Sequence, residues 1–332
     1  MIVFSEKHLR KLFEQFVSRK IVVLGDLMLD RYIWGRVSRI SPEAPVPVVE
    51  IESESFRFGG AANVAHNVCS LGTEVIPVGV IGDDGSGEVL RNLFKEKGFP
   101  TDGLFMEHER STTVKTRIIA HSQHVVRTDR EIRSGISRKL QREILDFLED
   151  CLDDVDGIII EDYNKGLLVP RFIEGVLGLA EKWNTLVFVD PKFDHFFDYR
   201  GVTLFKPNRK EVAAKLGVRL DSDSALARAG EKLLNRLECK ALLITLGEEG
   251  MALFEPEKSW IKIPTRAVKV HDVSGAGDTV IATMAVSMAS GSNLQEAATI
   301  ANYAAGMVCG EIGIVPVDRE KLFQSLQEMV ET

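Results

Sequence analysis

The feature that most constrains the fold is a regular alternation of short apolar runs and helical patterns in the second half of the chain. The apolar runs cover about 157–160, 186–189, 202–205 and 241–244, and the helical patterns cover about 137–152, 170–183 and 223–237. Short all-apolar runs are typical of strands buried on both faces of a parallel sheet, and the helices between them are typical of right-handed crossovers. The sequence therefore predicts an α/β fold with a mostly parallel central sheet.

Polar residues or glycines lie beyond these runs, beyond an earlier run at 21–24, and beyond a strand-like run at 268–270. They are Asp30, Asp162, Asp190, Lys192, Asn208, Glu211, Thr245, Gly247 and Asp278. The carboxyl ends of parallel strands meet at one edge of a sheet, which is where α/β proteins bind ligands. We therefore expect these residues to line one site.

Two blocks of the first half, at about 31–58 and 112–131, do not fit the alternation. Three prolines at 42, 45 and 47 exclude a helix from the first block, and 46–51 is expected to be a strand. Alternating apolar residues around a turn predict a hairpin in the second block. Together the blocks predict a small β-sheet beside the central one. Between them, Gly59 and Gly60 open a helix of small residues, where a ligand or another backbone can approach closely.

The segment 272–279 combines a glycine turn with a carboxylate at the start of an apolar helix. Gly275, Ala276 and Gly277 can bring backbone N–H groups to an anion, which the start of a helix favours. Asp278 can cap the helix, or it can take a proton from a hydroxyl that attacks a phosphate.

These parts suit phosphoryl transfer, which needs N–H donors, a metal ion and a base. Asn208 and Glu211, three residues apart at a helix start, could hold Mg²⁺ through its water molecules, or they could form a capping box. No Gly-x-x-x-x-Gly-Lys-Ser/Thr sequence occurs, so the glycine turn would have to bind the phosphate. No Gly-x-Gly-x-x-Gly follows the first strand, which argues against a dehydrogenase.

Composition narrows the class of protein further. The 332 residues carry a net charge of −8, which argues against a nucleic-acid surface. The N-terminus lacks an apolar signal core, and no apolar run is long enough to span a bilayer, so we expect a cytoplasmic protein without a membrane partner. The four cysteines, at 69, 151, 239 and 309, are widely spaced and are interpreted as reduced thiols.

Several motifs together resemble those of the ribokinase (PfkB-type) carbohydrate kinases in their order and spacing. They are Gly59-Gly60-Ala61-Ala62-Asn63, Gly82-Asp83-Asp84-x-x-Gly87, Asn208-x-x-Glu211, Thr245-Leu246-Gly247-x-x-Gly250 and Asp272-x-x-Gly275-Ala276-Gly277-Asp278. The resemblance implies one ribokinase-like domain over 1–332, built as a three-layer α/β/α sandwich. It also implies a small β-sheet lid from the two blocks, which often forms a dimer contact, and the use of ATP and Mg²⁺.

The resemblance also implies roles for particular residues. Asp278 would be the base, and the amides of Gly275–Gly277 would form the anion hole. Asn208 and Glu211 would organise the metal and the phosphates. The remaining implied sites are a nucleotide pocket with Thr245, Gly247 and Gly250, an adenine contact at Asn302 and Gly306, and a sugar-hydroxyl site with Asp30, Gly59, Gly60 and Asn63.

A narrower group of motifs is similar to the D-glycero-β-D-manno-heptose-7-phosphate kinases. These motifs are Gly25–Tyr32, Arg39–Val49, Asp162-Tyr163-x-Lys165-Gly166 and Val189-Asp190-Pro191-Lys192. The similarity implies phosphorylation of the anomeric hydroxyl to give the 1,7-bisphosphate, for the ADP-heptose of lipopolysaccharide. The proline-rich run could instead be lid architecture shared with kinases of fructose, ribose or phosphofructose. A sugar or nucleotide sensor without turnover is the alternative from another class of protein.

A phosphorylated sugar needs cations at its far end. Arg127 and Lys165 are the predicted contacts, Asp162 joins the predicted substrate site, and Lys192 is expected to meet phosphate from nucleotide or sugar. In some members of the resembled group a nucleotidyltransferase domain follows the kinase. This sequence ends at Thr332, about where a kinase would end, so we expect either a kinase alone or a piece of a longer protein.

Overall fold

The computed structural model describes residues 4–121, 123–266, 272–311 and 313–330. Its main sheet has the strand order β13-β12-β11-β10-β9-β8-β1-β4-β5. The strands from β11 to β5 in this order are parallel to one another. Strand β12 is antiparallel to both β11 and β13. Their bounds are β1 Lys20–Gly25, β4 Glu74–Gly82, β5 Leu104–Glu107, β8 Gly157–Glu161, β9 Leu186–Asp190, β10 Leu204–Phe205, β11 Leu242–Thr245, β12 Met251–Phe254 and β13 Ile261–Ile263.

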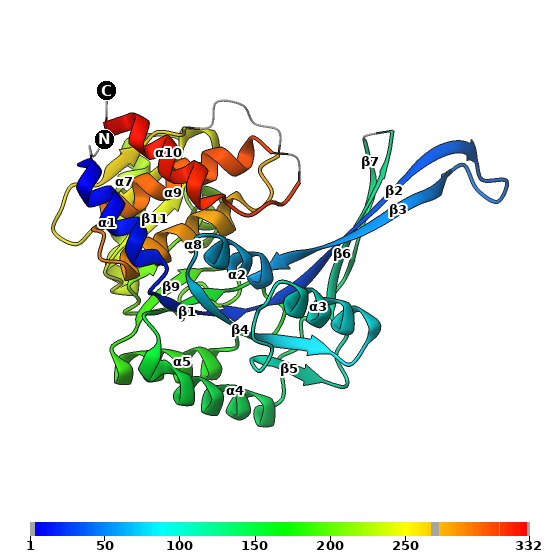
Figure 1. The fold of residues 1–332 in the computed structure, drawn as a ribbon, viewed down its shortest axis with the longest axis horizontal. Coiled ribbons are helices and arrows are strands. Elements are labelled where there is room, and N and C mark those ends of the chain that lie inside the picture. The colour runs from blue at the N-terminus through cyan, green and yellow to red at the C-terminus, as the bar shows by residue number, and fades with distance from the viewer. Residues whose placement is uncertain (1–3, 122, 267–271, 312, 331–332) are drawn as a thin grey trace.

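Helices cover both faces of this sheet (Figure 1). Both faces are covered because the strands are apolar on both sides, and an apolar core lies on each face of the sheet. In β1, Ile21 and Val23 belong to the first core, and Val22 and Leu24 belong to the second. The first core includes residues of α1 Glu6–Phe16, α2 Ala61–Ser70, α3 Gly85–Glu96, α8 Ala276–Ala289, α9 Leu294–Cys309 and α10 Arg319–Val330. The second includes residues of α4 Arg138–Cys151, α5 Pro170–Trp183, α6 Arg209–Leu216 and α7 Asp223–Leu237. The predicted three-layer α/β/α sandwich is confirmed.

A second, four-stranded sheet projects from this body (Figure 1). Its order is β3-β2-β6-β7, with β2 Leu27–Ile40 antiparallel to β3 Pro47–Gly60 and parallel to β6 Thr113–Ala120. The hairpin of β6 and β7 Gln123–Arg130 is the one that alternation predicted. We call these four strands the small sheet. A single residue, Asp26, joins β1 of the main sheet to β2 of the small sheet.

The structure corrects three details of the predicted elements. The strand expected at 46–51 begins one residue later, at Pro47, and continues to Gly60 as the 14-residue strand β3, and the equally long β2 precedes it. The four-residue strand β5 was not predicted, and β10 has two residues rather than the expected 202–205. The strand expected at 268–270 lies outside the described residues.

Two expectations from composition can be compared with the described residues. All four cysteines are free thiols, as expected. Within the described ranges, no helix combines the length and the apolar character needed to cross a bilayer.

Candidate active site

The site is built around the start of α8. Gly275 precedes this helix with φ of 81°, a left-handed conformation that favours glycine. A Cβ atom added there would lie 3.1 Å from Nδ2 of Asn63, so the turn also leaves room for that amide. No side chain among the described residues caps the helix. Its first N–H groups therefore lie where an anion could meet the positive end of the helix dipole.

Asp278 lies in the first turn of α8 and is only 6 % exposed. The Asn63 side chain donates a hydrogen bond of 2.7 Å to Oδ2, and the Tyr163 hydroxyl donates one of 3.1 Å to Oδ1. Burial raises the pKa of Asp278 to about 6, while the Asn63 hydrogen bond opposes that rise. A carboxyl that titrates near neutral pH can both accept and release a proton under ordinary conditions.

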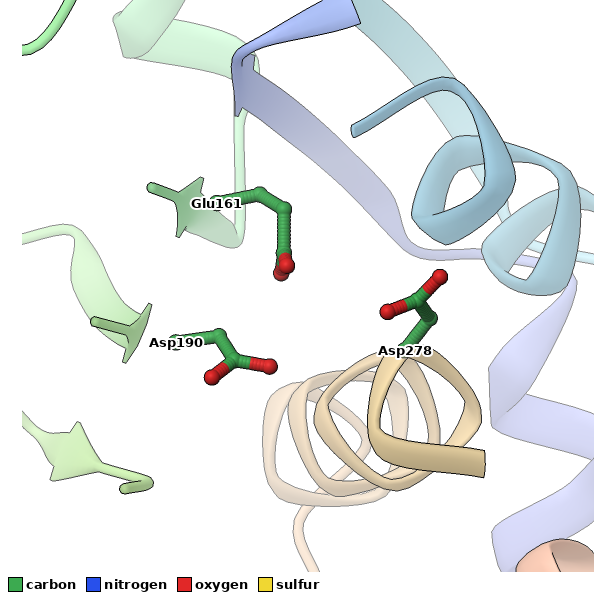
Figure 2. Close-up of side chains that lie close together, drawn as sticks. All are labelled: Glu161, Asp190 and Asp278. Carbon is green, nitrogen blue, oxygen red and sulfur yellow. The ribbon is translucent and has the colours of Figure 1, made fainter. Parts of the chain in front are cut away.

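Three buried carboxylates meet in front of this helix. Oxygen atoms of Glu161, Asp190 and Asp278 lie within 4.8 Å of one another, and Figure 2 shows all three side chains pointing into the same space. Glu161 is fully buried, and neither of its carboxylate oxygens has a hydrogen-bond partner among the described residues. Burial, and then the charges of Asp190 and Asp278, raise its pKa well above the usual value.

The fold explains why these carboxylates meet. Glu161 ends β8 and Asp190 ends β9, and the two residues are register partners in adjacent parallel strands. Side chains of paired residues point to the same face of a sheet, and α8 packs over that face. Sequence reasoning placed Asp190 at the sheet edge but assigned no role to Glu161. The signal was present, because Glu161 directly follows the apolar run Ile158–Ile160 as Asp190 follows Val187–Val189.

The same cluster fits a divalent cation. Mg²⁺ prefers oxygen ligands at about 2.1 Å, so oxygens on opposite sides of the ion lie about 4.2 Å apart. The separations in the cluster are of that order. A cation there would also give the two unpartnered oxygens of Glu161 the compensation that buried charge requires. One positive group is already present, since Nζ of Lys206 lies 2.7 Å from Oδ2 of Asp190.

The predicted sugar-hydroxyl residues lie where β2 and β3 reach the start of α2. Asp30, on β2, is 2 % exposed and forms an ion pair with Arg117 of β6. A Cβ atom on Gly59 would lie 2.7 Å from Oδ2 of Asp30, so this glycine lets the carboxylate lie against the backbone. Gly60, which precedes α2, has φ of 56°. Asn63, in the first turn of α2, is hydrogen-bonded to Asp278 and so links this group to the proposed base.

The loop after β8 is held by a different carboxylate, Asp26. Its Oδ2 atom accepts hydrogen bonds from the backbone N–H groups of Tyr163 and Lys165, at 2.8 and 3.0 Å. Burial, and then Asp162, raise the pKa of Asp26 to about 6. Asp162 has its own partners, Tyr199 Oη at 2.7 Å and the Asn164 N–H at 2.8 Å, one on each carboxylate oxygen. Its predicted contact with substrate stays a prediction, and these bonds favour a structural role.

The predicted nucleotide residues form a second group. Asn208 and Glu211 make the capping box of α6, with reciprocal hydrogen bonds of 3.0 and 2.8 Å. The other oxygen of Glu211 accepts a hydrogen bond of 3.1 Å from Lys192, so both of its oxygens have partners. Asn208 also bridges to Thr245, at the end of β11. The metal role of Asn208 and Glu211 stays a prediction, and the carboxylate cluster is the better-fitting cation site.

Four predicted nucleotide residues lie beyond this group. Gly247 and Gly250 both have positive φ, at 66° and 92°, in the turn between β11 and β12. Asn302, in α9, is 5 % exposed and donates a hydrogen bond of 2.7 Å to the carbonyl oxygen of Pro264. Gly306 lies one turn further along the same helix. Their roles in nucleotide binding stay predictions.

The two cations predicted for a sugar phosphate already have acidic partners. Lys165 lies 2.7 Å from Glu131, and Arg127 lies 3.0 Å from Asp129 on the same strand. The side chain of Arg127 is 59 % exposed, whereas that of Lys165 is 11 % exposed. The structure therefore places Lys165 at the base of the small sheet, and it leaves Arg127 largely in solvent.

The fold by itself defines a class of protein. Ribokinase from Arabidopsis thaliana, in complex with ribose and ATP, superposes with a TM-score of 0.73 at 18 % identity, over 95 % of this chain and 99 % of that one. Phosphofructokinase-2 from Escherichia coli, with substrates and products, gives a TM-score of 0.74 at 18 % identity, over 93 % and 99 % of the two chains. The architecture is therefore the ribokinase fold.

Sequence comparison identifies the family. Residues 18–319 match the pfkB family carbohydrate kinase, and the chain belongs to this family. The class of enzyme that the family defines is the ATP-dependent sugar kinase.

Curated relatives carry a more specific name. The bifunctional protein HldE of Citrifermentans bemidjiense is 43 % identical over 318 residues, which are 96 % of this chain and 65 % of that protein. HldE of Helicobacter acinonychis is 42 % identical over 304 residues, 92 % of this chain and 65 % of the relative. The chain thus spans a little less than two thirds of the length of these relatives.

Proposed function

We propose that the protein uses ATP to phosphorylate the anomeric hydroxyl of D-glycero-D-manno-heptose 7-phosphate, giving the 1,7-bisphosphate for ADP-heptose and lipopolysaccharide synthesis. The observation that carries the kinase part of this proposal is the buried Asp278 at the uncapped start of α8. The motifs shared with heptose-phosphate kinases and the HldE relatives support the choice of sugar. Within the proposal, residues 1–332 act as one kinase domain.

Asp278 is the proposed base. Its two hydrogen-bond donors, Asn63 and Tyr163, fix the plane of the carboxylate and leave further lone pairs for a hydroxyl. Asp278 takes the proton as the sugar oxygen attacks the γ-phosphorus of ATP, and ADP departs as the leaving group. The N–H groups around Gly275–Gly277 stabilise the negative charge on the transferred group, as a helix start can.

Asp30, Gly59, Gly60 and Asn63 are the proposed sugar-hydroxyl site. The proposal is supported by the Asp30 carboxylate next to Gly59 and by the hydrogen bond from Asn63 to Asp278. A carboxylate and a carboxamide can each make two hydrogen bonds to neighbouring hydroxyls. Arg117 fixes the position of the Asp30 carboxylate through their ion pair. This arrangement supports a polyol that presents one hydroxyl to the base.

Lys192, Asn208, Glu211, Thr245, Gly247, Gly250, Asn302 and Gly306 remain the proposed ATP contacts. The pKa of Lys192 supports a phosphate contact. Burial lowers this pKa, but Asp190, Glu211 and Glu161 raise it above its ordinary value, so this partly buried lysine keeps its charge. The carboxylates Glu161 and Asp190 are the proposed holders of Mg²⁺, which when bound neutralises phosphate charge.

Substrate turnover tests the proposal. ATP consumption with Mg²⁺ is measured for heptose 7-phosphate, fructose 6-phosphate, fructose 1-phosphate, ribose and fructose. The proposal expects a strong preference for heptose 7-phosphate and a 1,7-bisphosphate product. Turnover of only another sugar would keep the kinase and overturn the heptose assignment. Binding of ATP with no turnover of any of these sugars would favour the sensor.

We also propose a homodimer formed through the small sheet. Of the large apolar side chains that are exposed in the described residues, Trp34, Ile40, Ile51, Val125 and Val126 lie on its strands. Val46, in the turn between β2 and β3, is exposed as well. Exposed apolar surface concentrated on one element is typical of a protein–protein contact. Because the enzyme would consume ATP, the proposal places it in the cytoplasm.

A further inference from the structure

The inner face of the small sheet carries a row of charges in register. Asp30 of β2 pairs with Lys115 of β6, and Lys115 pairs with Asp129 of β7. Paired residues of neighbouring strands point to the same face, so all three side chains lie on the face that bears Asp30. Arg117, two residues after Lys115, lies on that face too. This face lies toward Asp278, because Lys115 contacts the ring of Tyr163 and the hydroxyl of that ring is hydrogen-bonded to Asp278.

Lys115 differs from most of the cations around the site. Arg57, the partner of Asp30 on β3, also lacks an ion pair in the described residues, but it donates a hydrogen bond of 3.1 Å to the carbonyl oxygen of Ile314. Arg117, Arg127 and Lys165 are paired with Asp30, Asp129 and Glu131, respectively. Lys192 and Lys206 are paired with Glu211 and Asp190. No ion pair joins Lys115 to any carboxylate in the described ranges, although the side chain is half-buried. A half-buried ammonium group that forms no ion pair within the protein would be stabilised by a bound anion.

The position of Lys115 relates it to the reacting centre. Its Nζ atom lies 4.8 Å from the centre of the Tyr163 ring, and the hydroxyl of that ring is hydrogen-bonded to Asp278. Lys192, one of the predicted phosphate contacts, also lies near this tyrosine, with its Nζ atom 4.7 Å from the centre of the ring. Lys115 and Asp278 therefore contact the same tyrosine side chain, one at the ring and the other at the hydroxyl. This arrangement suits a sugar whose reacting hydroxyl lies at Asp278 and whose other end lies near Lys115.

The charges nearby favour an anion over a neutral group. Burial lowers the pKa of Lys115, Asp30 and Asp129 oppose this effect, and Lys165 and Arg117 lower the pKa further. A bound anion would relieve the repulsion among these three cations. A sugar hydroxyl would not, because it carries no charge.

We propose that Lys115 binds an anionic group on the sugar substrate, and that it makes the enzyme select a phosphorylated sugar over the free sugar. This inference rests on the proposed function, since it concerns the substrate of the same site. A lysine is suited to this role because it meets phosphate as a compact point charge with three donors. Lys165 and Arg117 stay paired with their carboxylates and shape the site around Lys115.

The test compares Lys115→Met with the wild type and with Arg36→Met. Arg36 lies further out on β2, pairs with Glu50 and is 64 % exposed, so its variant removes one positive charge from the same sheet away from the site. Values of kcat/KM are measured for two pairs of substrates, heptose 7-phosphate with the free heptose, and fructose 6-phosphate with fructose. Lys115→Met is expected to lower kcat/KM for the preferred sugar phosphate by about tenfold to a hundredfold, the size expected for one charge-assisted hydrogen bond. The free sugar should change little, and Arg36→Met should match the wild type.

The outcomes separate this inference from the proposed function. If Lys115→Met lowers both members of a pair equally, or neither, the Lys115 assignment is overturned and the heptose kinase stands. If the wild type prefers fructose 6-phosphate and Lys115→Met removes that preference, Lys115 keeps its role and the heptose assignment is wrong. A wild type that prefers a free sugar overturns both.

A second measurement avoids variants that fail to fold. The wild-type protein is treated with an amine-acetylating reagent, and modification of Lys115 is followed by mass spectrometry. The preferred sugar phosphate should protect Lys115, and the matching free sugar should not. Lys210, near the start of α6 and away from the small sheet, serves as the unprotected reference. Equal modification of Lys115 with and without the sugar phosphate would overturn the assignment, and Lys115→Arg should restore part of the preference lost in Lys115→Met.

Discussion

The hydroxyl of Tyr163 should help to set the pKa of Asp278, and with it the pH above which the enzyme is active. It donates a hydrogen bond of 3.1 Å to Asp278, a carboxyl whose pKa is raised to about 6 by burial. The donor stabilises the ionised carboxylate, so Tyr163→Phe removes a contribution that lowers the pKa. The phenylalanine ring keeps the aromatic surface that Lys115 and Lys192 both contact. The expected result is a higher pKa for Asp278 with little change in packing.

The magnitude follows from the strength of one hydrogen bond to a charged group. Such a bond contributes about 1.5–3 kcal/mol, and one pKa unit corresponds to about 1.4 kcal/mol. Removing it should raise the pKa of Asp278 by about one to two units, from about 6 to about 7–8. Because the base must be ionised to accept a proton, the loss of activity should be large near pH 6 and small well above pH 8.

The assay is kcat/KM for the sugar, with ATP saturating, from about pH 5 to about pH 9, where the acid limb reports the free enzyme's base. Tyr199→Phe is the matched control, because its buried hydroxyl donates a 2.7 Å hydrogen bond to a different carboxylate, Asp162. That variant should unfold more easily while its acid limb stays in place. An acid limb of Tyr163→Phe that coincides with the wild type would refute the reasoning.

Four further predictions follow from single features of the structure. Asp278→Asn should lower kcat by about a hundredfold or more while ATP binding, followed by calorimetry, stays close to wild type; near-normal turnover would remove Asp278 as the base. Glu161→Gln should abolish the rise in melting temperature that Mg²⁺ or Mn²⁺ gives the wild type, and an unchanged rise would place the cation elsewhere. Gly250→Ala should lower the free energy of unfolding in urea by more than about 1 kcal/mol, because φ is 92° and the added Cβ would lie 2.0 Å from the Ile263 carbonyl oxygen; a stability equal to wild type would contradict this. Ile51→Asp should convert the proposed dimer to a monomer in light scattering with an unchanged melting curve, and a persistent dimer would exclude the small sheet as the contact.

Much of the main sheet could be predicted from the sequence because its signals are local. Strands β8, β9 and β11 are short apolar runs between helices, and buried strands of this kind are recognisable without knowing their neighbours. The four-residue strand β5 and the two-residue strand β10 were harder to predict. Pairing with neighbouring strands defines them more than their own composition does.

The candidate site shows the same division between local and distant signals. The glycine turn before Asp278 and the capping box of Asn208 and Glu211 are patterns within a few residues, and both were visible in the sequence. The contact between Tyr163 and Asp278 joins residues 115 positions apart, so no local pattern could indicate it. The role of Glu161 in the carboxylate cluster becomes apparent only when β8 and β9 are seen to be adjacent beneath α8. The importance of Lys115 likewise depends on the register of the small sheet.

The short connection at Asp26 has a mechanical consequence. This residue is the whole link between β1 and β2, and its side chain also holds the backbone of Tyr163 and Lys165. If the small sheet turned on this joint, the Asp26 carboxylate would move with it, and the backbone of Tyr163 would have to follow or release its hydrogen bond. The position of the small sheet is therefore coupled to the alignment of the Asp278 carboxylate. An outward rotation of the sheet would disturb the hydrogen bond that Tyr163 donates to the base.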